Sequence, residues 1–155
     1  MRNNRLRDMR SGSLTAIGMV LVFGFLVAMV SAPVSAVVIN FPDPGLEAAI
    51  RDAIGKPTGE ILDTDLAALT RLDADNRGIV NLDGIQYCTN LTTLNLYGNE
   101  IIDISALSGL NKLMDLDLGY NQIVDISALS GLTNLTWLSL SSNQVSDIST
   151  LSGLT

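Results

Sequence analysis

Residues 91–154 contain three successive copies of one 22-residue pattern. The copies begin at Leu91, Leu113 and Leu135, and each carries Leu-x-x-Leu-x-Leu-x-x-Asn-x-Ile/Val followed by an Asp-Ile-Ser tripeptide. A unit this short does not bury its own apolar face, so neighbouring units must stack and share one continuous core. The repeat therefore predicts a solenoid, which presents a surface instead of enclosing a catalytic centre.

The spacing of the leucines predicts the inside and the outside of each coil. Alternation in a strand places Leu94 and Leu96 on one side and Thr93, Asn95 and Tyr97 on the other. A period of 20–29 residues with this pattern is typical of a leucine-rich repeat. We therefore expect an α/β solenoid, with a parallel sheet on the concave side and short 3-10 or irregular segments on the convex side.

The same register continues upstream in a divergent form. Residues 69–90 keep apolar residues at the repeat positions, with Arg77 in place of the asparagine. We expect these residues to form a divergent first coil, and residues 91–155 to form three regular ones. The apolar residues expected in the core of the first coil are Leu72, Ala74, Ile79, Leu82, Ile85 and Cys88.

Residues 37–68 have the features of a helical N-terminal cap. Asp43 suits a helix N-cap, Pro44 the first helical position and Gly55 the stop. Asp63 is expected to cap a second short helix over residues 64–69. The first helix is predicted to bury one apolar face, formed by Leu46, Ala49, Ile50, Ala53 and Ile54.

Residues 1–36 resemble a secretory leader. Four arginines precede an uncharged run from Ser11 to Asn40, and small residues end at Ala36. We expect a signal peptide cut after Ala36; the alternative is an uncleaved anchor, because the apolar run approaches the length of a membrane span. Both interpretations place the rest of the chain outside the cytoplasm, either secreted or at the cell surface.

The exported part is acidic. The leader holds four of the 9 basic and one of the 16 acidic residues, so 5 basic and 15 acidic residues remain, a net charge of −10. This charge disfavours nucleic acid and favours a partner with a basic surface. A membrane contact is expected only through an uncleaved N-terminal segment.

The C-terminus has no segment with the features of a cap. The next copy of the pattern would begin at position 157, beyond Thr155. We expect a truncated product or fragment that lacks further repeats or an anchoring module. The alternative is a short natural protein whose open end is covered by association.

Two polar columns repeat with the leucines. Asn99, Asn121 and Asn143 fall at the bend after each strand, where an amide can satisfy backbone donors and acceptors. The aspartates of the three Asp-Ile-Ser tripeptides (Asp103, Asp125 and Asp147) are interpreted as caps of a helical turn on the convex side. A metal column is the weaker interpretation, because calcium needs six or more oxygens around one point.

At this point the chain resembles the bacterial, internalin-like leucine-rich repeat proteins. The resemblance rests on 22-residue units ending in D-I-S-x-L-x-x-L and on a cap-like segment that begins Phe41-Pro-Asp-Pro-Gly-Leu-Glu-Ala-Ala-Ile-Arg. It covers about residues 40–155. It implies a curved right-handed solenoid with a helical cap, an extracytoplasmic location and protein binding through the concave face. The wall-anchoring and inter-repeat regions of internalins are absent from this sequence.

Candidate binding residues are the outward positions of the strands, which vary between copies. Three exposed aromatics beside polar groups are typical of interface hot spots. Arg71, Thr93 and Ser141 fall on the same side of the strands. The candidate ligand-binding residues on the concave face are Asp73, Asp75, Asn95, Tyr97, Asp115, Asp117, Tyr120, Trp137 and Ser139.

The sequence predicts a binding module and no enzyme. With no histidine in the chain, Cys88 has no Cys–His partner, and its register predicts a buried packing residue. We expect no cofactor and no metal. The leading hypothesis is an exported protein-interaction module; the alternatives are a carbohydrate-binding surface, supported by the aromatics and carboxylates, and a structural spacer for a missing C-terminal domain.

Overall fold

The computed structural model of the chain describes residues 36–154. The predicted leader, apart from Ala36, lies outside this range. Within it, no helix is both long and apolar enough to cross a bilayer.

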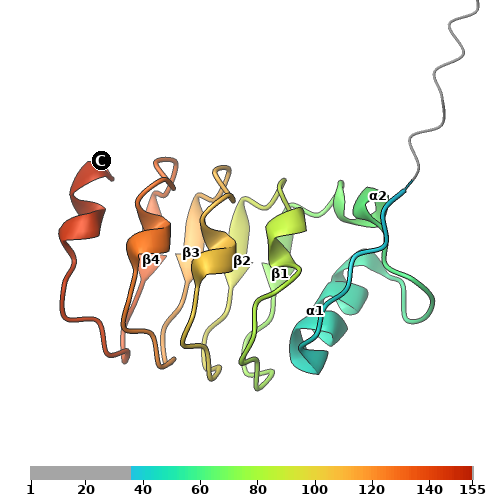
Figure 1. Cartoon of the computed structure of the whole chain (residues 1–155), viewed down its shortest axis with the longest axis horizontal. Helices are drawn as coiled ribbons and strands as arrows, with labels where there is room; N and C mark the ends of the chain where they lie inside the picture. The colour runs from blue at the N-terminus through green and yellow to red at the C-terminus, as the bar shows by residue number, and fades with distance from the viewer. Residues whose placement is uncertain (1–35, 155) are drawn as a thin grey trace, which may run out of the picture. The chain divides into compact units, whose positions relative to one another are not determined.

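Four short parallel strands form one sheet in chain order (Figure 1). They are β1 (Arg71–Asp73), β2 (Thr93–Asn95), β3 (Asp115–Asp117) and β4 (Trp137–Ser139). Each residue pairs with the residue 22 positions later, so that Leu72 faces Leu94, Leu94 faces Leu116 and Leu116 faces Leu138. The repeat length therefore sets the register of the whole sheet.

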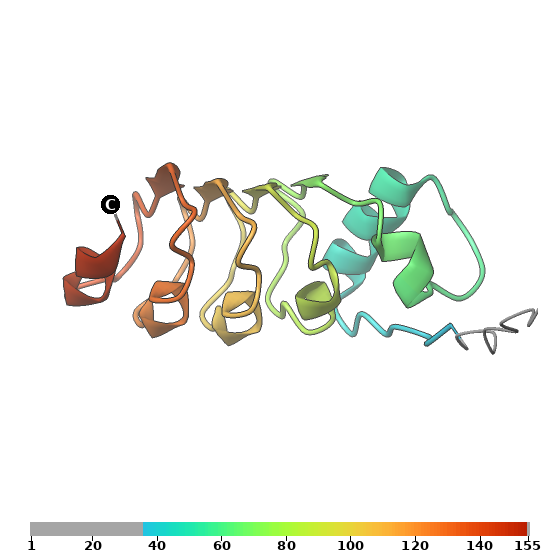
Figure 2. The same ribbon diagram turned by 90° about the horizontal axis from the view of Figure 1, so that it is seen from above.

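A row of short 3-10 helices runs opposite the sheet, as Figure 2 shows. The helices are η1 (Ile85–Tyr87), η2 (Ser105–Leu107), η3 (Ser127–Leu129) and η4 (Ser149–Gly153). Between the two rows lies the core, in which the predicted residues of the first coil, including Cys88, are at most 2% exposed. The predicted leucine-rich repeat solenoid is confirmed.

The last coil is packed less completely than the others. Leu116 and Leu118 are fully buried, whereas their counterparts Leu138 and Leu140 are only partly buried. Ile148 is 66% exposed, although its counterpart Ile126 is 2% exposed. Apolar side chains of this coil therefore meet solvent at the end of the stack.

The asparagine column ties each coil to the one before it. Asn121 accepts a hydrogen bond from the amide of Ile101 (3.0 Å) and donates to the carbonyl oxygens of Leu96 and Leu118 (both 3.0 Å). Asn99 and Asn143 repeat these contacts one coil earlier and one coil later. The predicted structural role of the asparagines is confirmed.

The aspartates of the Asp-Ile-Ser tripeptides accept hydrogen bonds from the backbone at the start of the 3-10 helices. The Oδ1 atoms of Asp103, Asp125 and Asp147 lie 2.7, 2.8 and 2.8 Å from the amide nitrogens of the serines two residues later. Each aspartate precedes the N-cap position, which an isoleucine occupies. The capping interpretation is confirmed, with this shift of one residue.

The cap begins with α1 (Pro44–Ile54). Asp43 accepts from the amides of Gly45 and Leu46, and Gly55 ends the helix at φ 65, a left-handed conformation that suits glycine. The predicted apolar face is wrong at Ala53, which is exposed. The helix buries Leu46, Ala49 and Ile50, and Ile54 is partly buried against the same core, so the predicted face holds at these four residues.

The second helix, α2 (Asp63–Leu66), is shorter than predicted, and the predicted cap is wrong. Asp63 is its first helical residue, and the N-cap is Leu62. Asp65 accepts from the Leu62 amide (2.8 Å) and from the Lys56 ammonium (2.6 Å). Asp63 instead accepts from the Val37 amide (3.0 Å), which joins α2 to the first described residues.

Asp43 also joins the cap to the first coil. Its second carboxylate oxygen accepts from the amides of Val80 (2.9 Å) and Asn81 (3.1 Å). Burial raises the pKa of Asp43, but hydrogen bonds from four backbone amides lower it further, so the net shift is below the ordinary value. The carboxylate is thus a charged link between α1 and the solenoid.

Candidate functional site

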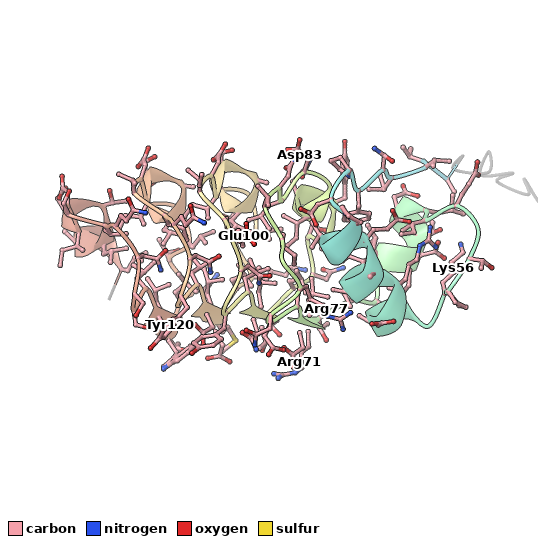
Figure 3. All side chains as sticks on the ribbon, turned by 90° about the horizontal axis from the view of Figure 1, so that it is seen from below. Lys56, Arg71, Arg77, Asp83, Glu100 and Tyr120 are labelled. Carbon is pink, nitrogen blue, oxygen red and sulfur yellow. The ribbon has the colours of Figure 1, made fainter. Side chains whose placement is uncertain are left out.

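The outward residues of the four strands form two rows across the sheet. The first row is Arg71, Thr93, Asp115 and Trp137; the second is Asp73, Asn95, Asp117 and Ser139. Figure 3 shows Arg71 and Tyr120 projecting from this same side of the solenoid, with Asp83 on the opposite side. We call this surface the sheet face; it is the surface that the sequence predicted as concave.

The aromatic residues of the sheet face are exposed and lie in two groups. Tyr120 is 56% exposed, Trp137 is 51% exposed and Tyr97 is 36% exposed. The rings of Tyr97 and Tyr120 lie 5.0 Å apart between centroids, tilted by 52°. Such contacts stabilise aromatic pairs and hold their orientation. Tyr97 and Tyr120 therefore form one aromatic pair, separate from Trp137.

Tyr120 reaches this pair from the turn after β3, where its backbone is left-handed. The same register position is left-handed in every coil: Asn76 (φ 52), Gly98 (φ 69), Tyr120 (φ 55) and Ser142 (φ 54). Asparagine and glycine tolerate this region, whereas a bulky side chain pays a steric cost of roughly 1–2 kcal/mol. The position in register with Tyr97 is Gly119, where a Cβ atom would lie 2.9 Å from Ser141 Oγ and 3.1 Å from Asp117 Oδ1, so polar side chains of the sheet face fill the space beside it.

Several polar side chains of the sheet face bond to one another. Asn95 donates to Asp73 (2.8 Å), and Asp75 accepts from Asn76 (2.8 Å). Asp117 accepts from the Gly119 amide (2.9 Å). These contacts fix the side chains in place while leaving carboxylate oxygens open to solvent.

One hollow, of about 310 Å³, lies on the sheet face. We call it the Trp137 hollow. It brings together four of the predicted residues but leaves out Tyr97, Tyr120, Asp73, Asp75 and Ser139. Its lining consists of Arg71, Thr93, Leu94, Asn95, Asp115, Asp117 and Trp137.

The thiol and the acidic residues of the described range bear on nucleophilic and metal chemistry. Cys88 is fully buried, and burial raises its pKa to about 12, so its thiol is not a thiolate at neutral pH. In the range 36–154, no three residues among His, Cys, Asp and Glu gather as a metal site. The exposed carboxylates and aromatics of the sheet face offer charge and apolar contact.

A second hollow, of about 470 Å³, was not predicted. It lies at the edge of the coils where the strands begin, beside Met114, which is 46% exposed, and Lys112. The sequence indicates this hollow at one position: Met114 is aligned with Thr92 and Thr136 of the neighbouring coils. An apolar residue in a column of threonines indicates a local change of surface.

Comparison with known proteins identifies the repeats. The leucine rich repeat family profile matches residues 89–145. Internalin H of Listeria monocytogenes serovar 1/2a is 38% identical over 68 residues, 43% of this chain and 12% of that protein. The crystal structure of an internalin (inlF) from Listeria monocytogenes has a TM-score of 0.73 at 44% identity, covering 74% of this chain and 34% of that one.

The chain carries an internalin-like leucine-rich repeat domain. An internalin C2 (inlC2) from Listeria monocytogenes gives the same architecture, with 37% identity and a TM-score of 0.56 over 74% of this chain and 62% of that one. This internalin-like chain spans 12–20% of the length of the curated relatives that it matches. The resemblance predicted from the repeats and the cap is confirmed.

Proposed function

We propose that the chain is an exported, non-enzymatic module that binds a protein partner through the sheet face. The internalin-like repeat supports protein interaction as the general role. The observation that carries the proposal is the set of exposed aromatics on the sheet face, of which Tyr120 is held in a left-handed conformation. Strained backbone conformations cluster at functional sites, and glycine, which the preceding coil has at this position, would meet the requirement of the turn without the steric cost.

The charges of the sheet face support a basic partner. Its two rows and Asp75 hold four aspartates and one arginine, a net charge of −3. Complementary charge steers association and selects against wrong partners. The proposed export rests on the leader-like residues 1–36.

Affinity capture with matched variants tests the proposal. The immobilised protein is exposed to secreted and surface proteins, and the same is done with Tyr120→Ala and with Tyr87→Ala. Tyr87 is 51% exposed but belongs to η1, on the opposite side of the coils. We expect Tyr120→Ala to weaken capture of a specific protein at least about tenfold, which is the size of a moderate hot spot. Tyr87→Ala should leave capture unchanged.

A carbohydrate ligand is the competing candidate, favoured by exposed aromatics beside carboxylates. A glycan array with the unmodified protein and with Trp137→Ala separates the two. Glycan binding that disappears in Trp137→Ala, without a protein partner sensitive to Tyr120→Ala, would contradict the proposal.

A further inference from the structure

The Trp137 hollow places an aromatic ring next to two carboxylates. Asp115 on β3 is in register with Trp137 on β4, and adjacent strands lie about 4.8 Å apart. Asp117 follows Asp115 on the same outward side of β3, one row further along. An indole and two carboxylates therefore border one opening. Leu94, which is buried, also lines it.

The carboxylates of the hollow retain free acceptor capacity. Within residues 36–154, the carboxylate of Asp115 accepts no hydrogen bond, and the carboxylate of Asp117 accepts one, at its Oδ1 from the Gly119 amide. Neither of them belongs to the three ion pairs of this part of the chain, which are Arg51–Glu47, Lys56–Asp65 and Arg77–Asp52. The negative charge of the hollow is therefore left for a partner to neutralise.

Arg71 lines the same hollow from its far side. It lies on β1, two strands from Asp115 and three from Trp137, which corresponds to about 10 and 14 Å between the strands. These are distances between backbones, and among residues 36–154 the Arg71 guanidinium forms no ion pair with Asp115 or Asp117, so it does not neutralise either carboxylate by direct contact. Figure 3 shows Arg71 extending away from the ribbon.

We propose that the Trp137 hollow receives an arginine side chain of the protein partner. The guanidinium would stack on the Trp137 indole and donate hydrogen bonds to Asp115 and Asp117. Arginine suits this arrangement better than lysine, because its planar group stacks on aromatic rings and donates to carboxylates in a fixed fork. The proposal rests on the proposed function and adds the chemistry that the partner presents.

Trp137 reports directly on the hollow, because it is the only tryptophan of the chain. Its fluorescence is followed while the peptides acetyl-Gly-Arg-Gly-amide, acetyl-Gly-Lys-Gly-amide and acetyl-Gly-Gln-Gly-amide are titrated separately. We expect a saturable change with the arginine peptide, with a dissociation constant on the order of 1 mM. The lysine peptide should bind several-fold more weakly, and the glutamine peptide about tenfold more weakly.

Matched variants distinguish the hollow from general charge attraction. Asp115→Asn should weaken binding of the arginine peptide about five- to tenfold. Asp83→Asn makes the same change of charge on the exposed opposite side and should leave binding within twofold. Arg71→Gln should strengthen binding slightly, because it removes a like charge.

Three results would overturn the proposal: equal binding of the arginine and glutamine peptides, equal binding of the arginine and lysine peptides, or equal weakening by Asp115→Asn and Asp83→Asn. Affinity capture of the protein partner shows whether only the arginine site is wrong or whether protein binding by the sheet face is wrong as well. A partner lost with Tyr120→Ala but fully retained by the double variant Asp115→Asn, Asp117→Asn would overturn the arginine site and leave protein binding by the sheet face intact.

Discussion

Tyr120 combines a backbone conformation that the repeat fixes with a side chain that varies between coils. Its position is left-handed in every coil, and the preceding coil has a glycine there. The bend after the strand imposes this conformation, and the side chain that occupies it is free to vary. In the third coil a tyrosine takes the position and packs its ring against Tyr97. A residue that the fold does not favour is thus kept on the surface that we propose to bind.

Glycine substitutions at the two tyrosines test this strain. Tyr120→Gly and Tyr97→Gly both remove the ring contact and both add freedom to the unfolded chain, but only Tyr120→Gly relieves a left-handed conformation. We expect Tyr120→Gly to cost less than Tyr97→Gly, by about 1–2 kcal/mol in the free energy of unfolding. Urea denaturation of the two variants measures the difference. Equal losses would show that Tyr120 carries no strain.

At the scale of elements, two kinds of polar side chain hold the coils and the cap together. The asparagine column closes the bend after each strand, and Asp43 performs a similar task between α1 and the first coil. The first coil has Arg77 where the others have asparagine, and this arginine pairs with Asp52 of α1 at 3.0 Å. At the junction with the cap, the ion pair between Arg77 and Asp52 therefore takes the place of the asparagine side chain that the other coils have.

Asp43 makes the stability of the cap sensitive to acid. Because the folded pKa of Asp43 lies below its ordinary value of 3.8, its contribution is present above that value and is lost as the pH falls through the folded pKa. We expect Asp43→Asn to lower the free energy of unfolding at pH 7 by about 2–3 kcal/mol, since backbone amides lose their charged acceptor.

Urea denaturation at pH 7 and pH 3 checks this expectation. The difference between the unmodified protein and Asp43→Asn should shrink at pH 3, because this pH lies below the ordinary pKa of 3.8, so the unfolded chain binds a proton at Asp43 more readily than the folded protein does. Asp83→Asn, an exposed change in the first coil, serves as the control and should cost less than about 0.5 kcal/mol. If Asp43→Asn lowers the free energy of unfolding by the same amount at pH 7 and at pH 3, the expectation is contradicted.

At the scale of the whole described part, the sequence predicted what the repeat period controls. A shift of 22 residues predicts the sheet register, the buried leucines and the asparagine column, because each coil must match its neighbour. Features without a repeat were predicted less well. The helix around Asp63 begins one residue earlier than expected, and Ala53 is exposed although its neighbour Ile54 packs against the core.

The candidate site was predicted in part for the same reason. Alternation in a strand places Asp115, Asp117 and Trp137 on one side, but it does not reveal that they border one hollow. Tyr120 was predicted to be exposed, whereas its left-handed backbone follows only from aligning it with Gly98 and Asn76. Side-chain groupings depend on turn geometry and on distances between strands, which spacing alone does not give.

The central claim is that the sheet face, and not the side with the 3-10 helices, meets the partner. Site-specific photo-cross-linking tests it most directly, with Tyr120→p-benzoylphenylalanine on the sheet face and Tyr87→p-benzoylphenylalanine on η1 as the matched control of similar exposure. We expect irradiation to join the captured protein to the chain at position 120 and not at position 87. Cross-linking at position 87 alone would contradict the account.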